Sequence, residues 1–465
     1  MVRTMNPQNP NSPPASSGGI SRRSALPLTA LAASSYKRIL GANDRVQVGF
    51  IGFGLIGHEH VFDFSHQKDC DLAAMCDVYQ PRLEEGLKAC GPQAKGYKDF
   101  RQMLDNKDLQ AVVIGTPDHW HAPLTILSCA AGKDVYVEKP LTLFVREGRW
   151  MVQAARKYNR VVQAGTQQRS GKHYQKAKEL LEAGYLGKIM YAHSGSQRNV
   201  MPGFGTPLDS DPPPDLDYNM WLGPAPLRAY NKLRSLYHFR WFWDYSGGQM
   251  TNLGAHELDI IHWVMQVKGP ISVSSVGGRF ALQDICETPD TQDAIFEYPG
   301  FTVHYAYREA SAGRRVGYGL EFNGERGGLV INRGGFEIFP DMKIDPMNAI
   351  PVFQGHPTGG PERSKTTPVP WTQPMKVPGS SAEQFDLHAR NFLDCVKSRQ
   401  RPIADVEGAH QVAVACHLAN MSLKLGRRLR WDADNEVVVG DAEANALLER
   451  PYREPWGQAV RHALA

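Results

Sequence analysis

The chain has 465 residues, which is too long for one hydrophobic core, so two domains are expected. Its 52 Lys and Arg residues nearly balance 48 Asp and Glu residues, and the formal net charge of +4 gives no indication of nucleic acid or an anionic membrane as a partner. No run of 18 apolar residues occurs, so no membrane-spanning helix is expected. The seven cysteines are scattered, which is typical of small core residues rather than of a disulfide framework or a metal site.

The first 44 residues are not expected to belong to the fold. Residues 1–19 are rich in Pro, Ser, Asn and Gly, which is typical of a disordered tail. Arg22 and Arg23 then precede a short apolar stretch, residues 25–33, and this order resembles a twin-arginine export signal. A periplasmic or otherwise exported protein is therefore expected, and the alternative is a cytoplasmic protein with a basic tail.

An apolar strand, Val46–Ile51, leads directly into a glycine-rich turn. In such a turn Gly52 permits the tight bend, Gly54 lets the backbone approach a pyrophosphate, and Gly57 lets the following helix pack closely on the strand. Asp77 ends the next apolar strand, where its carboxylate can accept hydrogen bonds from the ribose of NAD and would repel the 2'-phosphate of NADP. NAD is therefore favoured over NADP, with contacts from Gly52, Phe53, Gly54, Leu55, Ile56, Gly57 and Asp77.

Strands and helices alternate from residue 45 to residue 167. Strands are expected at 46–51, 72–76, 111–114, 135–137 and 161–164, and helices at 81–90, 122–132 and 146–158. Most of these strands are continuous apolar runs, as in a sheet buried on both faces. The sequence therefore predicts an α/β fold whose N-terminal part is a Rossmann domain, a doubly wound parallel sheet with its ligand at the carboxyl ends of the strands.

The pattern changes after residue 167, and a second α/β domain is expected over 168–432. A helix at 173–183, a strand at 188–197 and a helix near 253–265 precede several strands between residues 271 and 339, which predict a mostly antiparallel sheet. Residues 339–379 form a Pro-rich stretch typical of a lid, an arm or an interface loop. Helices at 385–398 and 405–425 are expected to return to the body, and residues 433–465 to form a docked tail.

Polar residues follow two of the predicted parallel strands. Residues 116–121 come after the strand at 111–114, and Glu138 and Lys139 come after the strand at 135–137. Both groups are expected to face the cofactor, and a lysine there can hydrogen-bond a substrate hydroxyl and lower its pKa. The alternative for Lys139 is a solvated turn residue paired with Glu138. The further cofactor contacts expected are Thr116, Pro117, His119, Trp120, Glu138, Lys139 and Gln167. No third ligand accompanies the histidines of this segment, so no metal is expected.

The segment 247–259 is the candidate site in the second domain. If it is helical from about Leu253, then Asn252, His256 and Asp259 share one face at spacings of i, i+4 and i+7 and can line a cleft. His256 is then a candidate proton acceptor, because imidazole titrates near neutral pH. The alternative is a histidine with only a structural role.

Over about residues 45–456 the chain resembles the Gfo/Idh/MocA oxidoreductases, on the basis of the three glycines, Asp77, the Glu138-Lys139-Pro140 tripeptide and segment 247–259. The resemblance implies a Rossmann domain and an α/β domain with a large open sheet that often forms the oligomer interface. It also implies a nicotinamide cofactor and substrates that are sugars, polyols or their derivatives.

The same resemblance assigns roles to single residues. It implies that Lys139 contacts substrate and cofactor and that His256 acts as acid or base. Many members carry an aspartate four residues before that histidine, whereas this chain has Asn252, and an amide cannot stabilise the imidazolium that a base becomes. Tyr245, Tyr174 or Lys139 itself could therefore share the proton transfer.

Segments 167–169 and 238–244 are candidates for sugar binding, since aromatic faces pack on sugar C–H groups while Arg or Asp side chains reach hydroxyls. The alternative for Trp241 and Trp243 is a place in the core or an interface. The catalytic candidates are Lys139, His256 and Asn252, and the substrate-binding candidates are Lys139, Arg169, Tyr174, Trp241, Trp243, Asp244, Asn252, His256 and Asp259.

The expected reaction is hydride transfer from a secondary alcohol carbon to NAD, with a base near His256 and Lys139. An exported enzyme lacks a pool that reoxidises NADH, so tightly bound NAD and a cycle that restores it are expected. That cycle could couple two sugars, or could cleave a glycoside by oxidation, elimination, water addition and reduction. A homo-oligomer, dimer or tetramer, is expected, and a noncatalytic NAD-binding sensor is the remaining alternative.

Overall fold

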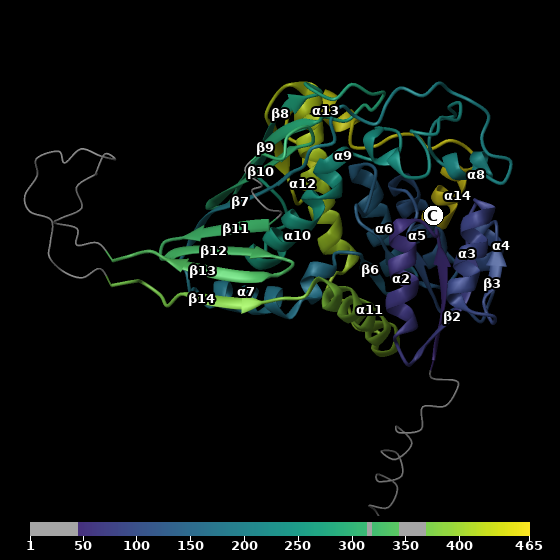
Figure 1. Ribbon diagram of the computed structural model, residues 1–465, viewed down its shortest axis with the longest axis horizontal. Helices are drawn as coiled ribbons and strands as arrows, with labels where there is room; N and C mark the ends of the chain where they lie inside the picture. Colours follow the sequence, from purple (N-terminus) through teal and green to yellow (C-terminus); the bar gives the residue numbers. More distant parts are fainter. Residues whose placement is uncertain (1–44, 314–318, 344–368) are drawn as a thin grey trace, which may run out of the picture. The chain divides into compact units, whose positions relative to one another are not determined.

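The computed structural model describes residues 45–313, 319–343 and 369–465. Within them, Val46–Ala465 forms one compact unit that contains two β-sheets (Figure 1). The predicted export signal lies outside the described residues, and so do residues 344–368 of the predicted lid, arm or interface loop.

The first sheet has six strands in the order β3-β2-β1-β4-β5-β6, and every neighbouring pair is parallel. Its strands are β1 (Val46–Ile51), β2 (Cys70–Cys76), β3 (Lys95–Tyr97), β4 (Ala111–Ile114), β5 (Asp134–Val137) and β6 (Val162–Ala164). The helices that connect them are α2 (Leu55–Ser65), α3 (Gln80–Cys90), α4 (Phe100–Leu104), α5 (His121–Ala130) and α6 (Val145–Lys157). The sequence pattern missed only β3 and α4, which are too short to show a period.

Continuous burial explains why this sheet is parallel and central. Every residue of β4 and β5 is buried, and so are all but one of the residues of β1. Strands of this kind need helices on both faces, which the alternating pattern supplies. The chain reverses its direction of winding between β1 and β4, and ligands of doubly wound sheets bind at that point.

The second sheet has ten strands in the order β14-β13-β12-β11-β7-β10-β9-β8-β15-β16, and only the pair β7 and β10 is parallel among them. Its strands are β7 (Ile189–Gln197), β8 (Ser272–Gly278), β9 (Thr291–Tyr298), β10 (Phe301–Arg308), β11 (Gly319–Gly324), β12 (Gly327–Asn332), β13 (Gly335–Pro340), β14 (Met375–Pro378), β15 (Leu429–Asp432) and β16 (Val437–Val438). The predicted α/β fold with a parallel and a mostly antiparallel sheet is therefore confirmed.

One face of the larger sheet is packed and the other is more open. Along β9 and β10 buried residues alternate with exposed or half-exposed ones, as strands with one covered face require. The covered side chains join a core with helices α10 (Gly254–Met265) and α12 (Val406–Leu425), which lie beside this sheet in Figure 1. The remaining helices of this region are α7 (Lys172–Glu182), α8 (Tyr218–Leu222), α9 (Gly248–Asn252) and α13 (Ala442–Ala446).

The predicted helix near 253–265 begins earlier and is interrupted. The short α9 ends at Asn252, and α10 starts at Gly254, with Leu253 between them. The common face expected for Asn252, His256 and Asp259 is therefore divided between two helices. Each of the three side chains has a different partner, as described below.

Segments from the C-terminal part of the chain complete the Rossmann region. Helix α11 (Ser381–Ser398) packs on α2, where the rings of Phe392 and Phe64 meet edge to face at 6.2 Å. Helix α14 (Trp456–Leu464) packs on α5 and α6, and its Trp456 ring lies 4.7 Å from that of Trp120. Residues far apart in sequence thus complete the packing on both faces of the parallel sheet, α11 with α2 in one core cluster and α14 with α5 and α6 in the other.

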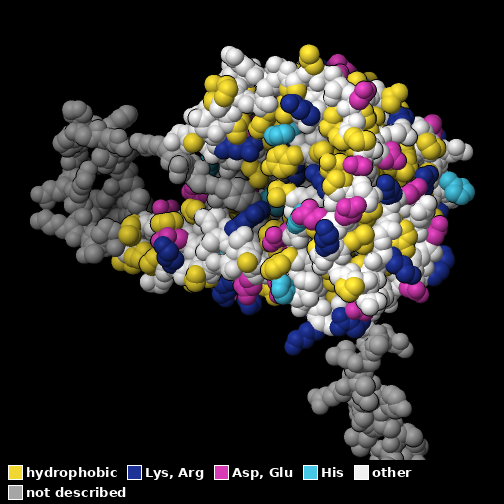
Figure 2. Space-filling model, turned by 45° about the vertical axis from the view of Figure 1, so that its right-hand side comes forward, with side chains coloured by type: hydrophobic (Ala, Val, Ile, Leu, Met, Phe, Trp, Pro, Cys, Tyr) yellow, Lys and Arg dark blue, Asp and Glu magenta, His cyan; other side chains and the backbone are white. Residues whose placement is uncertain are grey.

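The surface of this unit mixes both signs of charge. On the face shown in Figure 2, Lys and Arg side chains are interspersed with Asp and Glu, which agrees with the nearly balanced composition. Among the described helices, none combines the length and apolar composition that a membrane crossing requires.

Candidate active site

The turn after β1 is shaped for a dinucleotide. Gly52 has a φ of +92°, a conformation that L side chains rarely adopt, and a Cβ on Gly57 would lie 2.3 Å from the Gly52 carbonyl oxygen. Gly54 caps α2 without a side chain, so the first backbone N–H groups of the helix stay available for an anion. The cradle therefore fits a pyrophosphate.

Asp77 lies beside this cradle at the end of β2. Its carboxylate accepts hydrogen bonds from the backbone N–H groups of Phe53 at 2.8 Å and Tyr79 at 2.9 Å. Burial raises the pKa of Asp77, although these hydrogen bonds oppose the shift. Its fixed orientation fits the ribose of a dinucleotide, and Arg82 of α3 contributes to the same wall.

A cavity of about 390 Å³ runs from the glycine turn along the carboxyl edge of the parallel sheet. Of the predicted site residues, those that line it are Gly52, Gly54, Leu55, Ile56, Asp77, Thr116, Pro117, Trp120, Glu138, Lys139, Trp241 and Asn252. The structure thus brings together residues at the carboxyl ends of β1 and β2, residues at the carboxyl ends of β4 and β5, and Asn252 at the end of α9.

Four predicted cofactor residues do not line this cavity but support it. Phe53 and Gly57 shape the glycine turn, as described above. His119 is fully buried, with its Nε2 atom 2.9 Å from the carbonyl oxygen of Trp221, and burial lowers the pKa of its ring to about 3. The Gln167 amide donates a hydrogen bond to Glu138 at 2.8 Å.

Five predicted substrate residues also lie behind the cavity wall. Arg169 and Asp259 form a buried ion pair, with Nη2 and Oδ1 2.7 Å apart. Tyr174 accepts a hydrogen bond from a neighbouring glutamine, Trp243 lies under the Lys424 ammonium group, and Asp244 pairs with an arginine. The expectation of sugar contacts from Arg169, Tyr174, Trp243, Asp244 and Asp259 has no geometric support in this arrangement.

Lys139 is the titratable group best placed for chemistry. Its Nζ atom donates hydrogen bonds to the Asn252 side-chain oxygen at 2.9 Å and to the Asn252 backbone oxygen at 3.2 Å. Burial lowers the pKa of Lys139 to about 8, and the positive charges of Arg240 and Arg333 act in the same direction, against Glu138 and Asp118. A lysine with such a pKa can exchange a proton near neutral pH.

Glu138 places a negative charge next to Lys139. Its buried carboxylate accepts hydrogen bonds at Oε1 from His60 at 2.9 Å and from Gln167. Burial opposes its charged form, but the hydrogen bond and charge of His60 and the charge of Lys139 outweigh this and lower its pKa. Glu138 is therefore a fixed negative charge next to Lys139, rather than a group that titrates during reaction.

His256 is in a different situation from the one predicted. It is 3% exposed, does not line the cavity, and its Nε2 atom lies 3.2 Å from an Arg333 nitrogen. Burial and the charges of Lys139 and Arg333 lower the pKa of His256 well below its ordinary value. Because Nε2 already accepts a hydrogen bond and the ring is hard to protonate, Lys139 is the better proton acceptor of the two.

The cavity also has a wall that the sequence indicated only in part, through the aromatic residues beside Arg and Asp in segment 238–244. It is lined by Arg198, Phe204, Trp221, Leu236, Tyr237, Phe239 and Arg240, mostly from the loop-rich region between β7 and α9. The alternation of aromatic residues with arginine in 237–241 was the available signal. Within the described residues, no group of three or more His, Cys, Asp or Glu side chains is arranged to hold a metal ion.

Comparison with known proteins places this geometry in a family. Residues 46–166 match a family described as "Oxidoreductase family, NAD-binding Rossmann fold", and residues 176–308 and 378–458 match its "C-terminal alpha/beta domain". Among solved structures, a levoglucosan dehydrogenase in complex with NADH and levoglucosan is 17% identical, with a TM-score of 0.61 over 83% of this chain and 99% of that chain. The WlbA dehydrogenase of Bordetella pertussis, in complex with NADH and UDP-GlcNAcA, is 18% identical with the same TM-score and coverage.

Curated relatives match over shorter stretches. Inositol 2-dehydrogenase of Salmonella paratyphi B is 27% identical over 165 residues, which cover 35% of this chain and 49% of that protein. A glycosyl hydrolase family 109 protein of Shewanella sp. W3-18-1 is 38% identical over 112 residues, which cover 22% and 24%. This chain thus spans half or less of the length of these relatives. The two family matches together cover well over half of the chain and confirm the resemblance: the protein belongs to the Gfo/Idh/MocA family of oxidoreductases.

Proposed function

We propose that this protein is an NAD-dependent oxidoreductase that removes a hydride from a secondary alcohol carbon of a sugar, polyol or glycoside. The observation that carries the proposal is Lys139, whose amine lines the cavity beside Asn252 with a pKa near 8. The dinucleotide cradle of Gly52–Gly57 and Asp77 opens into the same cavity.

Lys139 acts as the base in this proposal. In its neutral form the amine takes the proton of the substrate hydroxyl, which lets the C–O bond become a carbonyl as the carbon loses its hydride. The two Asn252 oxygens orient the amine, and the fixed charge of Glu138 stabilises the ammonium ion that results. When bound, the nicotinamide ring of NAD supplies the hydride acceptor.

NAD rather than NADP is proposed as the cofactor because the Asp77 carboxylate would repel a 2'-phosphate. Arg82 lines the cavity near the same glycine turn and could offset that repulsion, so both cofactors belong in the test. Comparing NAD and NADP affinities in Asp77→Ala with wild type separates the two: the mutation should weaken NAD more than NADP.

The first experiment is to purify the protein, denature it and assay the released dinucleotides by mass. Near-stoichiometric NAD would support a tightly bound cofactor that is restored in each cycle. A cofactor-free protein that reduces added NAD with a sugar or polyol would support an ordinary dehydrogenase. No turnover of any sugar, polyol or glycoside in either form would leave the noncatalytic sensor and contradict the proposal.

A redox-neutral glycosidase is the second candidate, and the similarity to the family 109 protein favours it. In such a cycle, oxidation of a ring hydroxyl acidifies the neighbouring C–H group, the aglycone is eliminated, water adds and the carbonyl is reduced again. Lys139 would then lose and regain one proton in each turnover. Release of the aglycone without net NADH production distinguishes this reaction from plain dehydrogenation.

Two wider expectations are kept as proposals. Export through the twin-arginine route is proposed from Arg22 and Arg23, and fractionation of the native host would test it.

A homo-oligomer is proposed through the open face of the larger sheet, which carries exposed apolar side chains such as Ile295 and Val330. Light scattering of the purified protein would test the oligomer.

A further inference from the structure

Arg240, which lines the cavity, forms no ion pair with a carboxylate among the described residues, although it acts on the charge of Asp118 from a greater distance. Arg240 is stacked on two rings, with its guanidinium carbon 4.7 Å from the centre of Phe239 and 5.4 Å from that of Tyr237. Its Nη1 atom donates to the Tyr237 carbonyl oxygen at 3.0 Å. These contacts fix the plane of the guanidinium group and leave its Nε and Nη2 atoms for another acceptor.

Arg198, the other arginine of this wall, is paired with a carboxylate. It binds the buried carboxylate of Glu309 through both Nε and Nη2, and its Nε atom lies 2.8 Å from Oε1. Gln249 donates to the same carboxylate at 2.7 Å. Among the described residues Arg240 has no such carboxylate within ion-pair distance, although it lines the same cavity.

The acidic residues of the cavity are already engaged elsewhere. Asp118 accepts a short hydrogen bond from Ser246, and Glu138 is held by His60 and Gln167. Asp77 lies at the glycine turn, where it accepts two backbone hydrogen bonds. The positive charges of Arg240 and Arg333 act on Lys139 here, and the negative charges of Glu138 and Asp118 oppose them. What distinguishes Arg240 is therefore its guanidinium edge, which has no carboxylate partner within ion-pair distance among the described residues.

We propose that the substrate carries a fixed negative charge, a carboxylate or a phosphate, that pairs with the free Nε/Nη2 edge of Arg240 while its reacting hydroxyl meets Lys139. The substrate class is then an acidic sugar derivative rather than a neutral sugar or polyol. A planar guanidinium edge binds two oxygens of one anion side by side, which gives both affinity and orientation. This inference rests on the proposed function, since it assigns the substrate of the same site.

The test is calorimetric titration of the protein saturated with NADH, using matched neutral and charged sugars. The probes are glucose, galactose and mannose, their uronic acids and their 6-phosphates. Wild type should bind at least one charged sugar about tenfold or more tightly than its neutral parent. The Arg240→Gln variant should weaken binding of that charged sugar about 10- to 100-fold and change binding of the neutral parent less than about threefold. If the uronic acid binds more tightly than the 6-phosphate, the anion of the substrate is a carboxylate. If the 6-phosphate binds more tightly, the anion is a phosphate.

Two further variants separate charge recognition from damage to the fold. Arg240→Lys keeps the charge but loses the paired edge, so it should retain part of the preference. Arg228→Gln removes an arginine that is paired with Asp244 and Glu287 and does not line the cavity, so it should bind all probes as wild type does. A preference that survives in Arg240→Gln, or that is absent from wild type, overturns the inference. Charged-sugar binding that appears only when the titration is repeated without NADH also overturns it, because the anion would then occupy the pyrophosphate cradle.

Failure of this inference can be distinguished from failure of the proposed function. Turnover of charged and neutral sugars with equal kcat/KM would contradict the anion site and leave the oxidoreductase standing. Charge-selective binding that depends on Arg240, without turnover of any probe, would support the anion site and contradict the oxidoreductase.

Discussion

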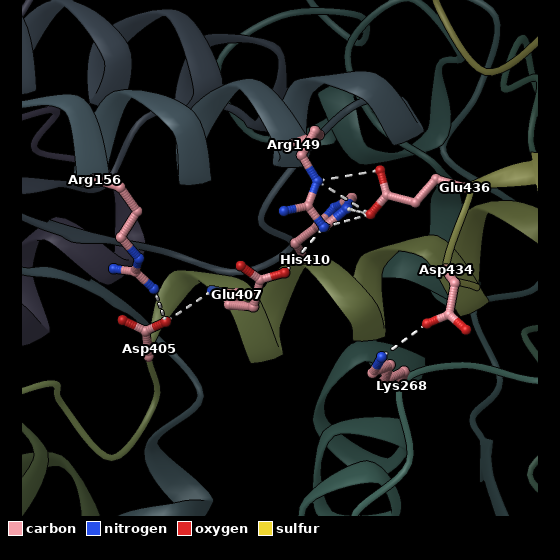
Figure 3. A network of polar contacts seen from close by, with 8 residues as sticks. All are labelled: Arg149, Arg156, Lys268, Asp405, Glu407, His410, Asp434 and Glu436. Carbon is pink, nitrogen blue, oxygen red and sulfur yellow. Dashed lines mark hydrogen bonds and ion pairs between the residues drawn. The ribbon is translucent and has the colours of Figure 1, made fainter.

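Two groups of charged residues in this protein have opposite designs. In the network of Figure 3, Arg149 of α6 pairs with Glu407 of α12 and with Glu436, and His410 donates to the same Glu436 carboxylate at 2.7 Å. At the cavity, the hydrogen bonds of the Lys139 amine go to the two Asn252 oxygens, with Glu138 as a nearby negative charge, and Arg240 contacts aromatic rings and one carbonyl group. The arginine between α6 and α12 is paired with carboxylates, whereas Arg240 at the cavity has no carboxylate partner among the described residues.

The difference teaches how this fold separates stability from function. A partly buried ion needs an opposite charge and hydrogen bonds to offset the loss of water. The α6/α12 network meets that need within the chain, so it can hold the Rossmann helices against the second sheet. Arg240 has no such partner among the described residues, and in our proposal the anion of the substrate supplies it.

The largest expected effect comes from removing the cavity base. Lys139→Met should lower kcat about a thousandfold, because Lys139 is the proposed acceptor of the hydroxyl proton, while NAD affinity should change less than about threefold. Steady-state kinetics and NAD titration by protein fluorescence measure the two. Lys424→Met is the matched control, since burial also lowers the pKa of Lys424 to about 8 but it lies over Trp243 outside the cavity. Near-normal turnover in Lys139→Met would show that the base lies elsewhere.

Breaking the paired network should cost stability and leave chemistry intact. Glu436→Gln removes the shared partner of Arg149 and His410, and we expect a loss of about 2 kcal/mol in the free energy of unfolding at pH 7, with unchanged kcat. Denaturant unfolding measures this loss. An equal fall in kcat would contradict the separation of the two regions.

Acid should act on the same network. Burial opposes ionisation of Glu436, but His410 and Arg149 outweigh it and lower its pKa to about 2. A carboxylate with a lowered pKa contributes stability above its unfolded value near 4.5 and loses it as pH falls towards 2. Between those limits the wild type should lose stability more steeply than Glu436→Gln.

Adding a charge at the cavity should shift the pH profile. Asn252→Asp places a carboxylate against the Lys139 amine, which should raise the pKa of Lys139 by about one unit or more and lower kcat/KM at pH 7 about tenfold. The acid limb of the kcat/KM profile would move to higher pH. If kcat/KM at pH 7 rises instead, His256 is the base, since the new carboxylate would then stabilise its imidazolium form.

The smallest effect is expected at the edge of the network. Lys268 and Asp434 form an ion pair at 2.7 Å, with side chains 68% and 78% exposed. Water screens such a pair, so Lys268→Ala should change the free energy of unfolding by less than about 0.5 kcal/mol. A loss comparable to that of Glu436→Gln would mean that an ion pair contributes to the free energy of unfolding regardless of its burial.

Local spacing made part of the site predictable from sequence. The glycine turn and Asp77 have tasks that depend on a few neighbouring residues, so their pattern identified both the fold and the cofactor cradle. Lys139 was predictable for the same reason, because it directly follows a buried parallel strand. The parallel sheet, the antiparallel sheet and the family were all confirmed.

Long-range packing decided what sequence could not. Trp241 and Trp243 are two positions apart in one aromatic segment, yet Trp241 lines the cavity and Trp243 lies beneath Lys424. Arg333, which contacts His256, comes from the turn between β12 and β13, far along the chain. Arg240 lies in a short 3-10 helix, His238–Trp241. Its aromatic neighbours suggested sugar contacts, but the local sequence did not indicate that Arg240 and Lys139 line the same cavity.

The docking of Trp456 has a consequence for biosynthesis. Its ring packs on Phe100 and Trp120, and Trp120 is itself part of the cavity wall. The ribosome makes the glycine turn some 400 residues before Trp456, so these two parts of the structure cannot pack together until the segment that carries Trp456 has been synthesised. In a nascent chain Trp120 would therefore lack one of its ring contacts until α14 docks, after the rest of the Rossmann sheet has been made.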